Sequence, residues 1–317
     1  MGICPKTLPG PRGRATLGYA RIAVEATVLT KVVLPLSLFI IMWGMGLSLT
    51  FEDFRRVGKV PKAVAVGLGL QMLLLPLLGY AVVSAMGLSG ALAVGLMVLA
   101  LSPGGVTSNM ISFLARGDVA LSVTLTALVS IISPFTIPLI LAPVMDALMG
   151  ESAAVNLPVG ETILQLLVIT IVPVTIGMVV RKYAPTFAAK SEKPVKILSL
   201  LFLFLIITGI MRQNWEQLPD FFAQAGLAAL VLNVVAMVVG FYGARAFQLE
   251  RKQCITVGVE VGIQNGTTAL VITGTILANP TMSIAPAIYS LIMFGTGAVF
   301  GILVNLGRKD EAPAVTA

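Results

Sequence analysis

One carboxylate lies inside a long apolar stretch of the sequence. Glu260 stands in VGVEVGIQNGTTALVI, and four amide or hydroxyl residues follow it closely: Gln264, Asn265, Thr267 and Thr268. Inserting a charged side chain at membrane depth costs about 2.5–3.5 kcal/mol, so such a residue is expected to have a structural or functional role. Glu260 could pair with Arg251 or Lys252 near a helix end, or it could bind a cation or carry a proton. The polar neighbours favour cation or proton chemistry.

Glycine residues interrupt the same stretch at four-residue intervals: Gly258, Gly262 and Gly266. Glycine is a poor helix former and allows backbone carbonyl groups to leave a helix. Non-helical backbone at membrane depth survives only inside protein or beside a cavity. Small residues at this spacing are also typical of close helix packing, so the glycines alone leave both interpretations open.

A second apolar stretch, LSPGGVTSNMISFLARGD, carries a matching interruption. Pro103 removes a backbone donor, and Gly104 and Gly105 loosen the turn. Three polar residues follow: Thr107, Ser108 and Asn109. Paired interruptions in two halves of a chain indicate a carrier built from inverted repeats, with broken helices that meet at the midplane. Half-helix N-termini can hold an anion there, and freed carbonyl oxygens can hold Na⁺.

The composition requires that these stretches cross a membrane. The 317-residue chain is 57% hydrophobic and 11% charged, whereas a soluble domain carries about 25% charged residues. A span needs about 20 apolar residues. We therefore expect an all-α polytopic membrane protein with a tail or interfacial segment at 1–31, a transmembrane domain at 32–307 and a cytoplasmic tail at 308–317. Nine spans are predicted, at about 32–49, 63–86, 91–115, 119–145, 162–180, 197–211, 226–247, 255–277 and 284–306.

Basic residues fall on alternate loops between these spans. The loop after the first span and every second loop from there hold 15 Lys and Arg residues, and the opposite loops hold Arg212 alone. Positive loops stay in the cytoplasm, which places the C-terminus there and suits a bacterial inner membrane. Nine spans leave the basic N-terminal tail outside. Either the segment 17–30 lies in the membrane interface or it forms a degenerate tenth span.

The sequence also excludes several kinds of function. It has no histidine, which excludes imidazole catalysis and histidine-ligated metals, and its two distant cysteines indicate no thiolate site. The sequence contains no Walker-type loop, so it gives no indication of an ATP-driven pump. The net charge of +7 is explained by the lysine and arginine residues of the loops, which set the orientation of the protein in the membrane. We therefore expect neither an enzyme nor a nucleic-acid-binding protein.

Three motifs resemble the bile acid:sodium symporter family. They are SPGGVTSNMISFLARGDVALSVTLTALVS, EVGIQNGTTAL and MGLSLTFEDFRRVGKVPKAVAVGLGLQ, and the resemblance runs from about Leu34 to the C-terminus. It implies inverted repeats, a panel domain and a core domain. The panel would comprise about 32–49 and 162–211, and the core about 63–145 and 226–306. Two broken helices, the third and eighth spans, would cross in the core.

The same resemblance implies two sodium sites that share one carboxylate. The first would comprise Ser108, Asn109, Ser122, Thr126 and Glu260. The second would comprise Gln71, Glu260, Gln264 and the backbone carbonyls of Val261 and Ile263. From the residues alone, the hydroxyls of the fourth span could instead bond to their own helix, and Gln71 could bond to a neighbouring helix. One carboxylate beside two Na⁺ leaves a net positive site, which favours an anionic substrate.

Substrate contacts follow from the resemblance as well, whereas the helix breaks follow from the glycine and proline residues. Asn265 matches the family's substrate-facing amide, and Asn109, Thr107 and Gly105 lie at the crossover. The expected helix breaks are Pro103, Gly104, Gly105, Gly262 and Gly266. Departures from the family pattern at Ser102, Val106 and 266–268 leave the substrate class open between a small carboxylate and an amphipathic, bile-acid-like anion.

We therefore expect a monomeric, sodium-coupled symporter that imports an organic anion through the lipid bilayer by alternating access. The alternative is a proton-coupled carrier or channel in which Glu260 titrates. Dependence on Na⁺ at constant pH distinguishes the two.

Overall fold

The computed structural model describes residues 29–150 and 157–306, and every regular element within these ranges is helical. Among the described residues, eight helices are long and apolar enough to cross a membrane. Two shorter helices, α6 (Gly90–Leu101) and α7 (Val106–Leu114), together form a ninth candidate span, with a bend of 66° between them. The prediction of an all-helical polytopic membrane protein is confirmed. The predicted C-terminal tail and nearly all of the N-terminal tail lie outside the described residues.

The other eight candidate spans are Lys31–Ser48, Pro61–Ala85, Val119–Met149, Val159–Tyr183, Pro185–Gln213, Leu218–Ala246, Arg251–Ile276 and Thr281–Leu303. Their helices are α2 (Leu34–Ser48), α4 (Pro61–Gly69), α5 (Leu75–Ala85), α8 (Val119–Met149), α9 (Val159–Leu166), α10 (Val172–Tyr183), α11 (Pro185–Gln213), α12 (Leu218–Phe221), α13 (Leu227–Ala246), α14 (Arg251–Gly262), α15 (Gly266–Val271) and α16 (Ile284–Leu303).

Two helix starts differ from the predicted spans. Helical structure in the first span is already present at Leu29, the first described residue, inside the predicted tail, and α11 begins at Pro185, well before residue 197. The early part of α11 carries several lysines, so hydropathy assigns it to a loop. Val195 in this part is nevertheless buried against Leu47 of α2. A charged segment stays helical here because one of its faces is packed.

Three spans contain a π-helical turn just before a proline. The turns are Leu29–Val33, Leu70–Leu74 and Leu167–Ile171, and the prolines are Pro35, Pro76 and Pro173. A proline lacks an N–H, and its ring clashes with the carbonyl group four residues earlier. A widened turn at this point accommodates both defects. Such turns are frequent at functional sites, and the second turn carries Gln71.

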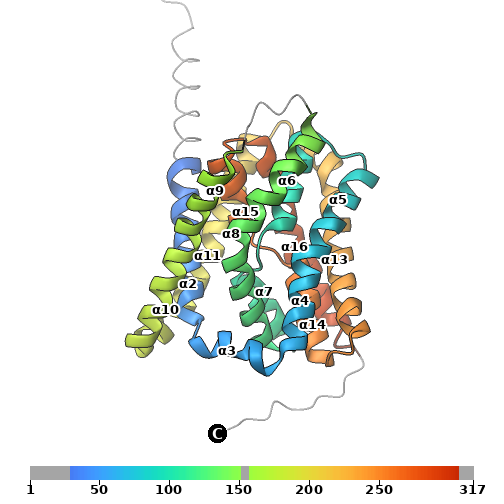
Figure 1. The fold of residues 1–317 in the computed structure, drawn as a ribbon. Helices are drawn as coiled ribbons and strands as arrows, with labels where there is room; N and C mark the ends of the chain where they lie inside the picture. Colours follow the sequence, from blue (N-terminus) through green and yellow to red (C-terminus); the bar gives the residue numbers. More distant parts are fainter. Residues whose placement is uncertain (1–28, 151–156, 307–317) are drawn as a thin grey trace, which may run out of the picture.

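The helices form two groups in Figure 1. Helices α2, α9, α10 and α11 stand together on one side, and α4, α5, α13 and α14 stand on the other. Glycines let α2 approach its neighbours closely. A Cβ atom on Gly44 would lie 2.3 Å from Val195 of α11, and one on Gly46 would lie 2.2 Å from the Val174 carbonyl oxygen of α10. The α2 backbone therefore packs directly against the α10 backbone and against a valine side chain of α11.

A short helix, α3 (Phe51–Lys59), runs across one end of the bundle and joins α2 to α4 (Figure 1). Arg56 of α3 pairs with Asp118 at 3.1 Å, and Asp118 caps α8 by accepting from the Leu121 N–H at 3.0 Å. On the exposed face, the Lys59 ammonium lowers the pKa of Glu52 by hydrogen bonding and by charge. The basic segments at the end of α10 and the start of α14 lie at this same end.

Candidate functional site

The two broken spans meet at their interruptions. Residues 102–105 separate α6 from α7, and residues 263–265 separate α14 from α15. The backbones of the two breaks touch, because the Asn265 N–H donates to the Pro103 carbonyl oxygen at 2.8 Å. The first break holds Pro103, Gly104 and Gly105, and the second is bounded by Gly262 and Gly266. The structure therefore brings together the two interruptions that the sequence shows far apart.

The Glu260 carboxylate is the centre of a buried oxygen cluster. One carboxylate oxygen accepts from the Ser122 hydroxyl at 2.5 Å and the other from the Thr126 hydroxyl at 2.8 Å. Asn109 Oδ1 lies 2.8 Å from Ser122 Oγ, and Ser108 Oγ lies 3.4 Å from Thr126 Oγ1. Helices α7, α8 and α14 thus bring all five residues of the first predicted sodium site into one cluster.

This cluster holds more acceptors than protons. The hydroxyl protons of Ser122 and Thr126 face three acceptors, namely both carboxylate oxygens of Glu260 and Asn109 Oδ1. The Ser108 proton is directed to the Gly105 carbonyl oxygen at 2.8 Å. A buried anion with too few donors is costly unless a cation joins it. A set made only of oxygens suits a hard cation.

A basic partner for Glu260 is not found within 29–150 and 157–306, where the ion pairs do not include it. Arg251, considered above as its partner, instead donates to the Val304 carbonyl oxygen. In the same residues, no three His, Cys, Asp or Glu side chains gather as a metal site of that type would require. The geometry therefore favours the cation or proton interpretation of Glu260 over a structural salt bridge.

Gly104 forms one wall of the cluster. A Cβ atom there would lie 2.6 Å from Glu260 Oε2, 3.1 Å from Ser108 Oγ and 3.2 Å from Thr126 Oγ1. Because carbon and oxygen atoms do not pack this closely, only glycine lets the first break approach the carboxylate. The sequence marked Gly104 as a helix break, and the structure adds this steric reason.

The members of the second predicted sodium site are arranged differently. Gln264 Nε2 donates to the carbonyl oxygens of Glu260 and Val261, at 3.0 and 2.8 Å, while Gln264 Oε1 has no partner. Gln71 is buried, and neither of its amide atoms has a partner. It lines a cavity with Ala100, Leu101, Ser102 and Thr136. No hydrogen bond joins Gln71 to Glu260 or Gln264, although its π-helical turn packs against α14.

A hollow lies beside the breaks, with α2 and α11 on one side and α7, α15 and α16 on the other. Gly105, Thr107 and Asn265 line it together with Ile41 of α2 and Leu203 of α11. Three of the four predicted substrate contacts thus face one space, whereas Asn109 is engaged in the Glu260 cluster. Asn265 Oδ1 caps α15 by accepting from the Thr268 N–H at 3.1 Å. Its amide nitrogen has no partner and is a donor available at the hollow.

Sequence reasoning missed two residues that contact the second break from other helices and a third that holds one of them. Asn233 and Tyr289 donate to the Gly262 carbonyl oxygen, and Thr296 donates to Asn233. A lone amide in the apolar seventh span was a usable signal for Asn233. Tyr289 and Thr296 gave no such signal, since aromatic and hydroxyl residues are common in membrane helices.

Comparison with known proteins settles the family. Residues 35–221, more than half of the chain, match the model of the Sodium Bile acid symporter family. The chain belongs to this family. The family resemblance read from the three motifs is thereby confirmed, and with it a multi-pass membrane protein.

Relatives of this Sodium Bile acid symporter family chain come from distant organisms. It is 26% identical to "Uncharacterized sodium-dependent transporter YocS" of Bacillus subtilis, over 80% of this chain and 76% of that protein. It is 28% identical to "Probable sodium/metabolite cotransporter BASS2, chloroplastic" of rice, over 83% of this chain. The match spans 61% of the rice protein's length. The human "Ileal sodium/bile acid cotransporter" is 27% identical over 86% of this chain and 79% of that protein.

Proposed function

We propose that this protein is a sodium-coupled symporter that imports an organic anion by alternating access. The observation that carries the proposal is the Glu260 cluster, in which a buried carboxylate meets hydroxyl and amide oxygens that outnumber their protons. The names of its relatives, which include sodium/metabolite and sodium/bile acid cotransporters, support the same class of function.

The first sodium ion is proposed to bind the Glu260 cluster, with oxygens from Ser108, Asn109, Ser122 and Thr126. The second is proposed to bind Gln71, Glu260, Gln264 and the carbonyls of Val261 and Ile263. An ion on the Val261 carbonyl needs the Gln264 amide to rotate, because Nε2 of that amide occupies this oxygen. Rotation turns Gln264 Oε1 toward the ion. Binding at the second site therefore reorients the Gln264 side chain in the break that borders the hollow.

The anion is proposed to bind in the hollow beside the two breaks. Two Na⁺ and one carboxylate leave one net positive charge nearby. The unpartnered Asn265 amide nitrogen, the Thr107 hydroxyl and the N-terminus of α7 offer donors to an acidic group. Ile41, Leu203 and Met293 give the hollow apolar walls for the rest of the molecule. These features fit a small carboxylate or an amphipathic anion.

Alternating access requires two bodies that move against each other, and we propose that these are the panel and the core. The closest glycine approaches, under 3.0 Å, join helices within one body. Gly177 approaches the Trp43 carbonyl oxygen within the panel, and Gly95 approaches the Met282 carbonyl oxygen within the core. Across the boundary, a Cβ atom on Gly266 would lie an ordinary 3.8 Å from Leu203 of α11. The glycine contacts are therefore closer within each body than at this point of the boundary.

The topology proposed with this function places the C-terminus in the cytoplasm of a bacterial cell, with the protein in the inner membrane. The basic segments that flank α3, α10 and α14 lie at one end of the bundle (Figure 1), as the positive-inside rule requires. A cysteine-accessibility experiment on Lys62→Cys in a Cys4→Ser background, with an impermeant reagent added to intact cells, should give no labelling. Labelling from outside would reverse the orientation.

The function is tested by the melting temperature of the detergent-purified protein in NaCl and in equimolar KCl at one pH. A ligand that binds the native state stabilises it by about 2.7 kcal/mol at a hundred times its dissociation constant. We expect a higher melting temperature in NaCl. No difference between the salts, together with a strong dependence on pH, would favour the proton-coupled alternative.

Asn265→Asp should separate anion binding from sodium binding. Aspartate keeps the oxygen that caps α15 but replaces the free amide donor with a negative oxygen that repels the anion. We expect the sodium-dependent rise in melting temperature to persist, and the further rise given by carboxylates or bile acids in wild-type protein to disappear. Asn214→Asp is the control, since the Asn214 amide bonds to its own helix at Ile210. Loss of both responses in Asn265→Asp would make Asn265 a cation-site residue.

A further inference from the structure

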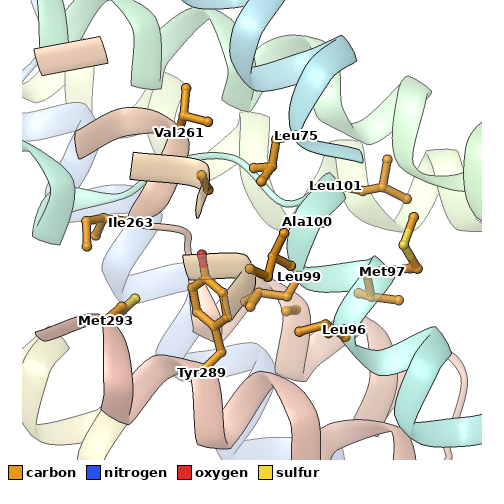
Figure 2. Packing of buried hydrophobic residues seen from close by; sticks show 14 of the residues in the cluster. Leu75, Leu96, Met97, Leu99, Ala100, Leu101, Val261, Ile263, Tyr289 and Met293 are labelled. Atoms are coloured by element: carbon orange, nitrogen blue, oxygen red, sulfur yellow. The ribbon is translucent and has the colours of Figure 1, made fainter. Parts of the chain in front are cut away.

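The last carbonyl group of α14 is held by side chains from two other helices. Asn233 Nδ2 of α13 donates to the Gly262 carbonyl oxygen at 2.7 Å, and Tyr289 Oη of α16 donates to the same oxygen at 2.8 Å. Both side chains are fully buried. Figure 2 shows the Tyr289 ring rising from α16 with its hydroxyl directed toward the segment that carries Val261 and Ile263.

A third residue sets the orientation of the Asn233 amide. The Thr296 hydroxyl donates to Asn233 Oδ1, so the amide oxygen faces α16 and the amide nitrogen faces Gly262. The same hydroxyl lies 3.0 Å from the Ile292 carbonyl oxygen of its own helix. Thr296, Asn233 and Tyr289 thus form one network that ends on a single backbone oxygen.

The need for this network follows from the way α14 ends. A helix leaves its last four carbonyl groups without partners inside the helix. The Val259 oxygen accepts from the Ile263 N–H at 2.7 Å, and the next two oxygens accept from the Gln264 side chain. The fourth of these carbonyl groups, that of Gly262, has its partners Asn233 and Tyr289 outside the broken span. Without them, a buried carbonyl oxygen would be unsatisfied at the point where the chain becomes extended.

The same two helices also press against both ends of the break. A Cβ atom on Gly262 would lie 2.1 Å from Met237 of α13, and one on Gly266 would lie 1.9 Å from Ser290 of α16. Between these contacts, Ile263 is extended, with φ −106° and ψ 104°. The break is therefore held by α13 and α16 through packing and through hydrogen bonds.

We propose that Asn233, Tyr289 and Thr296 are positioning residues for the second sodium site. They hold the Gly262 carbonyl, so that the carbonyls on either side, those of Val261 and Ile263, keep the positions that an ion needs. The inference rests on the proposed function. Ligands that are already ordered bind an ion more tightly than ligands that must be ordered on binding, so loosening the network lowers sodium affinity.

The test is a sodium titration of melting temperature for Tyr289→Phe and Thr296→Val, at constant ionic strength with KCl. Each substitution removes one hydroxyl and keeps the shape of the side chain. The sodium concentration at half of the maximal shift should rise about tenfold in Tyr289→Phe, which corresponds to about 1.4 kcal/mol. It should rise by a smaller factor in Thr296→Val, because Thr296 acts through Asn233.

Two matched variants serve as controls. Tyr242→Phe removes an exposed hydroxyl on α13, and Thr208→Val removes an exposed hydroxyl that bonds to its own helix. Neither should change the half-saturating sodium concentration. Should Tyr289→Phe fail to fold, Thr296→Val still decides the matter, because Thr296 lies at the half-buried edge of the network.

A purely structural network gives a different result. The melting temperatures of the variants would then fall equally in NaCl and KCl, with the half-saturating sodium concentration unchanged, and the proposal would be overturned. Failure of the proposed function is seen separately, as a wild-type protein whose melting temperature does not respond to sodium at all.

Discussion

Glu260→Gln should abolish both the sodium-dependent rise in melting temperature and sodium-driven uptake. Glu260 supplies the charge of a cluster whose other members are neutral hydroxyl and amide groups. Glutamine has the same shape, so the packing persists while the attraction for the cation is lost. The stabilisation lost is the whole sodium contribution, about 2.7 kcal/mol at a hundred times the dissociation constant. Melting in NaCl and KCl measures it directly.

The same variant makes a second, opposite prediction in KCl. A buried charge without a basic partner is costly, and neutralising it removes this cost. The melting temperature of Glu260→Gln in KCl should therefore equal or exceed that of wild type. Glu161→Gln, at an exposed position in the first turn of α9, is the control for removing an acid elsewhere. A sodium response that survives in Glu260→Gln contradicts both sodium assignments.

Gly104→Ala is expected to weaken sodium binding at least tenfold without removing any ligand. The new methyl group would stand 2.6 Å from Glu260 Oε2, so either the carboxylate or the first break must move. Both movements pull the cluster apart, and the half-saturating sodium concentration in the thermal titration should rise accordingly. The expected rise corresponds to about 1.4 kcal/mol or more.

Gly69→Ala is the matched control for this glycine. It lies at the end of α4, and a Cβ atom there would meet nothing within 4 Å. Alanine is the better helix former, so this variant should melt at the wild-type temperature or above it. Unchanged sodium titration in Gly104→Ala would show that the ion does not bind at the Glu260 cluster.

The sequence was most informative where a charged residue or a proline interrupts an apolar stretch. Glu260 and the Pro103 break stand out because charge and proline are expensive within apolar spans. Ser122 and Thr126 entered the predicted site through the family resemblance. Their convergence on one carboxylate is a property of three packed helices, which no single helical pattern reveals.

What could not be predicted depends on backbone atoms. The partner of Asn233 and Tyr289 is a carbonyl oxygen, which every residue carries, so no side-chain pattern marks Gly262 as their target. The early start of α11 was missed for a related reason. Hydropathy records the lysines of this segment, whereas the packing that keeps it helical depends on Val195 and its neighbours on α2.

The bond between the Asn265 N–H and the Pro103 carbonyl oxygen joins two segments far apart in the chain through main-chain atoms alone. Every amino acid except proline at residue 265 carries the donor, and every amino acid at residue 103 carries the acceptor. Side chains around the crossing can therefore change over evolutionary time while the crossing itself persists. A lineage can thus acquire a new cargo by altering the walls of the hollow, and inherit its crossover unchanged.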